Sequence, residues 1–517
     1  MASRLRSNSM NRLRRADAAA LVAIVAAFGS VWAASTSVAN ETDWIAPSIG
    51  ALQRMPHDPE AERTKQVTPP ILPGYSVYAD PAGAIGTFMP GGSVITSTNA
   101  FFQDLGSNGR TCFSCHQPQS GWGMSARSVR DDFEDTFGHA PIFRPVDGAV
   151  CPTADVSSLA ARRKAYSLLL DKGLIRIGIA IPTGTEFSIA SVADPHGCNT
   201  NPATGLTSPT SDIVSTYRRP LPSANLAFIN AIMWDGREPS LESQATDATN
   251  GHAQATTPPT PAQVSQIVAF ETGVLTAQSF DNRAGDLESN GATGGPEFLP
   301  ATVAAFFPGI NDPLGGNPKG TPFTSVIFTL YNAWASLTGS WESERRAQIA
   351  RGQAVFNTKP ITITGVAGLN DVVGQPTISG FCGTCHDSPN VGNHSVKFPI
   401  NIGIAGSGPL DPVKGTGAAP ILDIDGLPVF TVSCDNGPLK GTTFTVTDLG
   451  RAMISGKCAD IGKFKGPILR GLAARAPYFH NGSARTLADV VTFYDQRFNI
   501  GFTEQEKKDL AAFLASL

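Results

Sequence analysis

Charged side chains are scarce in this 517-residue chain, in which Asp, Glu, Lys and Arg together make up only 16% of the sequence. The formal net charge is -4, and no cluster of Lys and Arg of the kind that contacts nucleic acid is evident. By contrast, 52 glycines and 39 prolines indicate a loop-rich fold. The chain is long enough for two or three domains with cores of their own.

Acidic residues are absent from residues 2–15, which carry five arginines, and an uncharged run follows from Ala18 to Asn40. A basic start before an apolar run predicts a secretory signal peptide. The small residues Ser37-Val38-Ala39 indicate cleavage after residue 39, with Val31-Trp32-Ala33 as a second choice. We therefore expect export to the periplasm. An uncleaved membrane anchor is the alternative, because the uncharged run is long enough to span a bilayer.

Histidine is also rare, yet two of the eight histidines directly follow a pair of cysteines. Residues 112–116 read Cys-Phe-Ser-Cys-His and residues 382–386 read Cys-Gly-Thr-Cys-His, and this spacing is the attachment signature of a c-type haem. The thiols can form thioethers to the two vinyl groups of one porphyrin, and the adjoining imidazole then binds the iron. A thioredoxin-like dithiol or half of a zinc site needs no His there. We predict two covalent haems, attached through Cys112, Cys115, Cys382 and Cys385, with His116 and His386 as proximal iron ligands.

The remaining four cysteines are outside these motifs. In an exported chain, an even number of cysteines outside the haem motifs favours disulfides. Proximity in sequence favours Cys151 with Cys198 and Cys434 with Cys458. Each pair lies between motifs, so we interpret both as staples of loops.

Hydrophobic periodicity and chain-breaking residues predict a coarse secondary structure. Residues 40–90 are rich in Pro and polar residues and predict an irregular arm. The segments 174–179 and 187–192 have strand patterns and are expected to pair as a hairpin. Helices are expected over residues 99–105, 127–137, 158–171, 341–356 and a C-terminal segment that starts with the capping box Thr503-Glu504-Gln505-Glu506.

The expected fold is mainly α-helical, with two cytochrome c-type domains that each hold one covalent haem, long loop-rich insertions and a little β structure. The expected boundaries are a signal peptide over 1–39, the arm over 40–90, a first domain with an insertion over 91–283, a Gly/Pro-rich linker or insertion over 284–322, and a second domain over 323–517.

Four further segments carry a resemblance to a known family. Residues 234–237 read Trp-Asp-Gly-Arg and residues 241–245 read Leu-Glu-Ser-Gln-Ala. Residues 467–472 (Pro-Ile-Leu-Arg-Gly-Leu) and 476–483 (Ala-Pro-Tyr-Phe-His-Asn-Gly-Ser) follow the second haem motif. In this order the segments resemble the bacterial di-haem cytochrome c peroxidases and their relative MauG. The resemblance implies a peroxidatic first haem, an electron-transfer second haem, and Trp234 between them.

The resemblance also implies an acid/base group above the first haem. Family peroxidases carry a Glu ten residues after the Gln of the second segment, and here that position is Gln254, with His252 two residues earlier. Histidine suits proton transfer because its unperturbed pKa lies near neutral pH. We predict that His252, Gln254 and Trp234 are catalytic. A structural His bonded to a carbonyl is the alternative for His252.

The sixth iron ligands are predicted from the same resemblance. The family has a Met fourteen residues after the His of Pro-Tyr-Phe-His, whereas MauG has a Tyr, and here that position is Tyr494. Met453 and His480 are the competing ligands of the second haem, and Tyr494 as a core aromatic is the alternative. Family peroxidases that need activation carry a removable distal His a short way before the segment that here reads Arg-Pro-Leu-Pro. The stretch 199–217 contains no His, so the first haem is expected to be open to peroxide. The family's calcium site uses an Asn at the position of Arg219, which makes calcium doubtful here.

These observations predict an exported peroxidase that reduces hydrogen peroxide at the first haem and oxidises a donor through the second. The donor is expected to be a small cytochrome c, a cupredoxin or a protein substrate, and a homodimer is possible. Two alternatives stay open: an electron-transfer di-haem cytochrome without peroxidase activity, and a haem dioxygenase of the polyisoprene-cleaving type.

Overall fold

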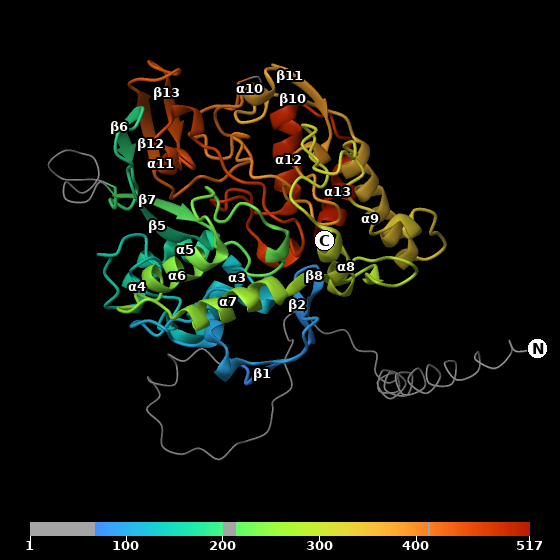
Figure 1. Ribbon diagram of the computed structural model, residues 1–517, viewed down its shortest axis with the longest axis horizontal. Helices are drawn as coiled ribbons and strands as arrows, with labels where there is room; N and C mark the ends of the chain where they lie inside the picture. Colours follow the sequence, from blue (N-terminus) through green and yellow to red (C-terminus); the bar gives the residue numbers. More distant parts are fainter. Residues whose placement is uncertain (1–67, 200–212, 412–413) are drawn as a thin grey trace, which may run out of the picture. The chain divides into compact units, whose positions relative to one another are not determined.

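The computed structural model describes residues 68–199, 213–411 and 414–517, all within one compact unit, Asp58–Leu517 (Figure 1). The predicted signal peptide over 1–39 lies outside the described residues. Within the described ranges, no helix combines the length and the apolar character needed to cross a bilayer.

The helices begin at Ser or Thr caps wherever the sequence predicted a long helix. Ser125, Ser340 and Thr503 each accept a hydrogen bond from the backbone N–H three residues later, which satisfies one of the free donors of the first turn. The α-helices are α3 (Ala126–Thr136), α4 (Leu159–Ala165), α5 (Ser167–Lys172), α6 (Leu241–Gly251), α7 (Pro261–Gly273), α8 (Leu299–Ala305), α9 (Trp341–Thr358), α10 (Asn370–Val373), α11 (Ala452–Ser455), α12 (Leu487–Phe498) and α13 (Glu504–Ala515).

Most helix predictions are confirmed. The capping box at residues 503–506 starts α13, and α9 begins and ends close to the predicted bounds. The predicted helix over 158–171 is two helices, because Tyr166 leaves the helical conformation between α4 and α5. The helix expected over 99–105 is a single turn of 3-10 helix, η2 (Ala100–Phe102).

Short antiparallel sheets carry more of the fold than the sequence suggested. The strands are β1 (Ile71–Leu72), β2 (Tyr75–Asp80), β3 (Gly83–Phe88), β4 (Val94–Ile95), β5 (Ile175–Ala180), β6 (Phe187–Ala193), β7 (Ile213–Arg218), β8 (Leu275–Asp281), β9 (Gly285–Asp286), β10 (Ile361–Thr364), β11 (Thr377–Gly380), β12 (Val429–Cys434) and β13 (Thr443–Val446). They form a four-stranded sheet in the order β2-β3-β8-β9, a three-stranded sheet β13-β12-β6, and three pairs, β1-β4, β5-β7 and β10-β11.

The predicted hairpin of 174–179 with 187–192 is wrong, although both strands exist. β5 pairs with β7, and β6 pairs with β12, where Phe187 lies opposite Cys434. Local pattern identifies a strand but not its partner, because the hydrogen bonds of a ladder are made to whichever strand the tertiary fold brings alongside. The pairing of β6 with β12 ties the insertion to the C-terminal half.

The predicted irregular arm is also wrong for its described end. β2 and β3 form a hairpin, in which Asp80 Oδ1 accepts from the backbone N–H groups of Ala82 at 2.7 Å and Gly83 at 3.0 Å. β3 then pairs with β8, nearly 200 residues later in the chain. The Pro and Gly residues therefore mark the turns of a sheet rather than an unstructured arm.

The core beside the second haem motif is formed by α9 and α13, which pack closely. A Cβ on Gly352 of α9 would lie 2.0 Å from the carbonyl oxygen of Asp509, so only glycine allows this approach. Phe328, Phe356 and Phe513 fill the space between these helices and the motif.

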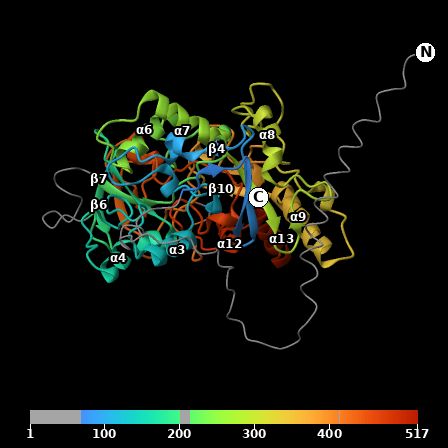
Figure 2. The same cartoon turned by 90° about the horizontal axis from the view of Figure 1, so that it is seen from below.

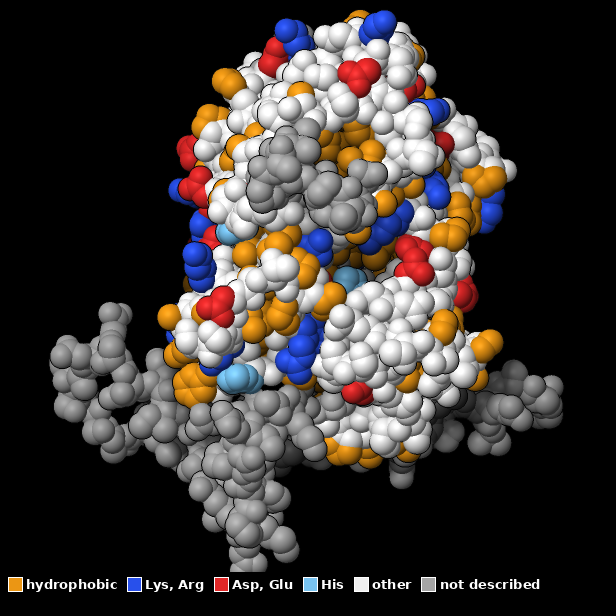
Figure 3. Space-filling view, turned by 90° about the vertical axis from the view of Figure 1, so that its left-hand side faces the viewer, with side chains coloured by type: hydrophobic (Ala, Val, Ile, Leu, Met, Phe, Trp, Pro, Cys, Tyr) orange, Lys and Arg blue, Asp and Glu red, His pale blue; other side chains and the backbone are white. Residues whose placement is uncertain are grey.

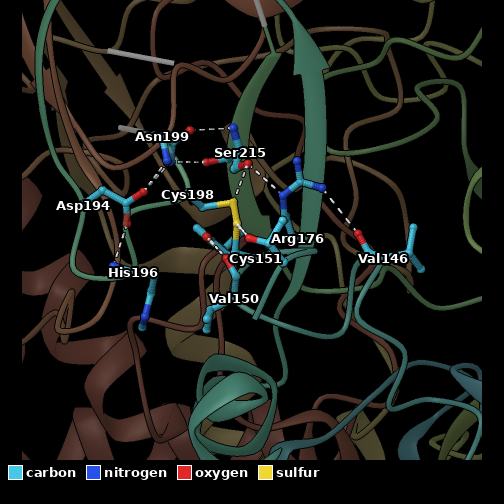
Figure 4. The surroundings of a disulfide bond; sticks show 11 residues. Val146, Val150, Cys151, Arg176, Asp194, His196, Cys198, Asn199 and Ser215 are labelled. Atoms are coloured by element: carbon cyan, nitrogen blue, oxygen red, sulfur yellow. Dashed lines mark hydrogen bonds between the residues drawn. A yellow bond between two sulfur atoms is a disulfide. The ribbon is translucent and has the colours of Figure 1, made fainter. Parts of the chain in front are cut away.

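Both predicted disulfides are present in the structure. Cys151 pairs with Cys198 with a Cα–Cα distance of 5.4 Å, and Cys434 pairs with Cys458 at 6.1 Å. Figure 4 shows the first bond beside Ser215 of β7. Both bonds join loops or strand ends around the insertion, as expected for staples.

Candidate functional site

The two Cys-x-x-Cys-His motifs have the same local structure. Each forms one turn of 3-10 helix, η3 (Cys112–Ser114) and η8 (Cys382–Thr384). In each turn a hydroxyl, of Ser114 or Thr384, accepts from the backbone N–H three residues earlier, at 3.1 and 3.0 Å. None of the four cysteines of the motifs takes part in a disulfide. The two turns thus present two thiols each, with the His directly behind them.

The two histidines are oriented in the same way. Nδ1 of His116 lies 3.1 Å from the carbonyl oxygen of Trp122, and Nδ1 of His386 lies 2.7 Å from that of Gly392. A carbonyl can only accept, so Nδ1 carries the proton and Nε2 keeps the lone pair. Burial lowers the pKa of both imidazoles to about 4, which keeps them neutral. This is the arrangement of a metal-binding His whose second nitrogen is fixed by the backbone.

Both acceptor residues lie six positions after their His and have a positive φ, 58° at Trp122 and 79° at Gly392. The left-handed backbone turns each carbonyl back toward the imidazole ring. A non-glycine residue in this conformation is uncommon, and Trp122 is held there by its indole, whose Nε1 donates to Thr87 Oγ1 at 2.9 Å.

The first motif faces a cavity with an empty volume of about 1430 Å³. Its walls come from residues 218–223, from α6 and from α7, in addition to the motif itself. α6 and α7 lie side by side in both ribbon views (Figures 1 and 2). On the face drawn in Figure 3, hydrophobic side chains gather in a hollow beside Lys, Arg and His side chains.

His252 lines this first cavity and is held by a buried carboxylate. Its Nδ1 lies 2.5 Å from Asp147 Oδ2, and Asp147 is also paired with Arg110. Burial alone would raise the pKa of Asp147, but the guanidinium of Arg110 and the imidazole of His252 hold it below its usual range. An ionised Asp147 accepts the Nδ1 proton, so His252 presents Nε2 as its proton acceptor.

Gln254, by contrast, is not brought to the cavity. It is exposed, its φ is 55°, and its Oε1 accepts from Asn108 Nδ2 at 3.2 Å. The expectation that it lies above the first haem is therefore not met. The chain leaves the end of α6 at His252, and the left-handed turn at Gln254 directs the amide to the surface.

The second motif faces a more apolar cavity, with an empty volume of about 1340 Å³. Tyr494 of α12 lines it, and burial raises the pKa of its phenol. Met453 and His480, the competing ligands, are buried but do not line this cavity. His480 instead stacks on Phe464, with ring centroids 3.9 Å apart.

His394 also lines the second cavity, and no sequence motif marks it. Neither ring nitrogen has a hydrogen-bond partner among the described residues, and Nδ1 lies 3.9 Å from Asp387 Oδ2. It follows Gly392 by two residues and so belongs to the loop that holds His386. Tyr494 comes from a different element, α12.

Trp234 and Lys465 line both cavities. Nε1 of Trp234 donates to the carbonyl oxygen of Arg219 at 2.8 Å, and the backbone N–H of Lys465 donates to the carbonyl oxygen of Trp234 at 2.9 Å. Burial lowers the pKa of Lys465 to about 8, and no carboxylate among the described residues compensates its charge. The expected place of Trp234, between the two sites, agrees with this geometry.

Glu271 of α7 is a second acidic group of the first cavity that the sequence did not indicate. It is 4% exposed, its Oε2 has no partner among the described residues, and burial raises its pKa to about 8. It is therefore a neutral carboxylic acid at neutral pH and can donate a proton. No local motif marks Glu271, Asp147 or Lys465, because each depends on what the fold places beside it.

Comparison with known proteins bears on the family resemblance. No family model matches the chain. Curated relatives are nevertheless found among bacterial cytochrome-c peroxidases, which confirms the family resemblance.

Two of these relatives illustrate the extent of the match. The chain is 46% identical over 78 residues to cytochrome-c peroxidase IdrP2 of Denitromonas iodatirespirans, which covers 14% of this chain and 21% of the relative. It is 33% identical over 99 residues to cytochrome c551 peroxidase of Nitrosomonas europaea, covering 17% and 30%. The chain thus spans less than a third of the length of these relatives. A solved MauG-like protein associated with microbial copper homeostasis aligns over 81% of this chain and 86% of its own, with 17% identity and a TM-score of 0.33.

Proposed function

We propose that this protein is an exported di-haem peroxidase that reduces hydrogen peroxide at a haem in the first cavity and takes electrons through a haem in the second. The observation that carries the proposal is His252, which lines the first cavity with Nδ1 held by Asp147. The relatives described above are cytochrome-c peroxidases, which supports the same activity.

The residues present fit two c-type haems. Cys112 and Cys115 would hold one porphyrin and Cys382 and Cys385 the other, with the two motif histidines as proximal ligands. The uncompensated ammonium of Lys465, facing both cavities, suits the carboxylates that haem carries. A bound haem supplies an iron that can bind peroxide and can take up and release electrons.

His252 acts as the acid/base group of the first cavity. Its Nε2 would take a proton from one oxygen of peroxide and return it to the other, which would let that oxygen leave as water, with the two electrons for O–O cleavage supplied by the bound haem. Asp147 holds the Nδ1 proton and stabilises the cationic imidazole that forms in between. Arg110, through its ion pair, keeps Asp147 ionised. Asp147 and Arg110 are therefore positioning residues.

Tyr494 lines the second cavity and would bind the iron of a haem held there. A phenolate donor favours the ferric and higher states and lowers the reduction potential. Trp234 connects the two cavities and carries electrons or holes between them. The electron donor is a small cytochrome c, a cupredoxin or a protein substrate, met in the periplasm after export.

A spectrum of the ferric holoprotein tests the function. We expect a high-spin component that binds cyanide, together with a low-spin or tyrosine-ligated component, in paramagnetic resonance and electronic spectra. In stopped flow, peroxide should react with the resting protein without prior reduction. Two fully low-spin irons without cyanide binding would instead identify an electron-transfer cytochrome. Oxygen uptake with an organic substrate and no peroxide would identify a dioxygenase.

Trp234→Phe tests the connection between the cavities. Phenylalanine keeps the ring but is much harder to oxidise and cannot donate to Arg219, so we expect electron exchange between the haems to slow by more than about tenfold, an added barrier of about 1.4 kcal/mol. The measurement is the rate at which the second haem is oxidised after peroxide is mixed with the protein. Unchanged exchange in this variant would rule out the indole as the connection.

A further inference from the structure

The guanidinium of Arg219 is bound by backbone carbonyls from three separate parts of the chain. Its Nη1 donates to the carbonyl oxygen of Lys172 at 2.8 Å, and its Nη2 donates to those of Arg475, at 2.6 Å, and Met124. Met124 follows the first haem motif, Lys172 ends α5 in the insertion, and Arg475 lies in the C-terminal half. One cation therefore joins three segments that are distant in sequence.

This arrangement is a binding site for a cation rather than a salt bridge. Arg219 is 6% exposed, and no carboxylate among the described residues compensates its charge. Burial, together with the nearby guanidinium of Arg475, lowers the pKa of Arg219 to about 9, which still leaves it charged at neutral pH. Gly173 makes room for it, because a Cβ there would lie 2.8 Å from Nη1.

Carbonyl oxygens from several segments are also the ligands that calcium prefers. The family resemblance implies a calcium ion between the domains, held in part by an Asn at the position of Arg219. The donor set here does not fit that ion, because the converging carbonyls already accept hydrogen bonds from Arg219. A divalent ion would moreover lie beside two buried guanidinium groups, Arg219 and Arg475, and would be repelled by both.

The same residue also positions the tryptophan between the cavities. The carbonyl oxygen of Arg219 accepts from Nε1 of Trp234 at 2.8 Å, and its backbone N–H donates to the carbonyl oxygen of His480 at 2.7 Å. The carbonyls that hold the guanidinium thus also fix the backbone that orients the indole.

We propose that the Arg219 side chain is a built-in cation that replaces calcium in joining the two halves of the molecule and in positioning Trp234. The protein is therefore independent of calcium. Replacement of Arg219 by Asn frees the carbonyls and restores an oxygen ligand, so that variant binds calcium.

The test compares the thermal midpoint of the holoprotein in excess EGTA and in calcium chloride, together with calorimetric titration of calcium chloride alone. For the unchanged protein we expect the same midpoint within about 1 °C and no calcium binding. Arg219→Asn should melt about 3 °C or more lower in EGTA, and calcium should restore the loss. Magnesium chloride serves as the control salt, and Arg127→Asn, at an exposed arginine, as the control variant.

Three outcomes would overturn the proposal: calcium stabilisation of the unchanged protein, an Arg219→Asn variant as stable in EGTA as the unchanged protein, or a destabilised variant that binds no calcium. If Arg219→Asn does not fold, the titration of the unchanged protein decides, with Arg219→Lys expected to stay calcium-independent because it keeps the charge. The proposal relies on the proposed function only for the role of Trp234. Thermal stability and calcium binding are measured without peroxide turnover. A failure of the Arg219 proposal can therefore be distinguished from a failure of the proposed peroxidase function.

Discussion

His252→Leu is expected to lower the second-order rate constant for peroxide consumption by about 100-fold to 10 000-fold, the usual contribution of a positioned acid/base group. Leucine occupies the same wall of the first cavity but can neither take a proton from peroxide nor return it. Stopped-flow mixing of ferric holoprotein with peroxide measures the constant directly. Cyanide binding should persist in the variant, because the cavity remains open.

Two further variants separate catalysis from local structure. Gln254→Leu changes an exposed side chain two residues away that does not line the cavity, and its rate constant should stay within about twofold of the unchanged protein. Asp147→Asn keeps the shape of the side chain but no longer stabilises the cationic imidazole of His252. Its rate constant for peroxide consumption should therefore fall, but by less than that of His252→Leu. Equal rates for His252→Leu and the unchanged protein would exclude His252 and direct attention to Glu271.

Tyr494→Phe is expected to raise the reduction potential of the second haem by on the order of 100 mV, because loss of a phenolate ligand removes its preference for ferric iron. The substitution removes one oxygen and conserves the ring, so α12 should pack as before. Spectroelectrochemical titration gives the potential, and the paramagnetic resonance spectrum of the ferric protein should change at the same time.

Met453→Leu is the matched control for this prediction. Met453 is buried but does not line the second cavity, so this variant should leave the potential and the spectrum unchanged. Unaltered spectra in Tyr494→Phe would exclude Tyr494 as an iron ligand. His394→Phe would then be the decisive variant, since His394 lines the same cavity and neither ring nitrogen has a partner there.

Sequence alone predicted the local features well, since their causes lie within a few residues. Thr503 and Glu506 form the predicted capping box of α13, and the cysteine pairs were chosen correctly by proximity. Strand partners were not predictable in this way. The pattern of residues 187–192 is satisfied equally by any neighbouring strand, and only the fold places β12 there instead of β5.

In the candidate site, too, some features follow from neighbouring residues in the sequence and others only from the fold. The motif at residues 382–386, like its counterpart at residues 112–116, has its cysteines and histidine within five consecutive residues. The family resemblance indicated Trp234 from its Trp-Asp-Gly-Arg motif and Tyr494 by counting along the chain, and the roles of both stay predictions. Counting failed at Gln254, where one left-handed residue turns the side chain to the surface. It also gave no indication of Asp147, which lies 105 residues from the imidazole that it holds.

The sequence by itself therefore determined which residues are predicted to hold haem, because the signature for covalent attachment and proximal ligation depends only on the spacing of adjacent side chains. Only the tertiary structure decided what surrounds the two motifs: the carboxylate behind His252, the uncompensated Lys465 and the carbonyls around Arg219. The physical reason is that burial and charge compensation depend on segments far apart in the chain, and these meet only when the whole fold has formed.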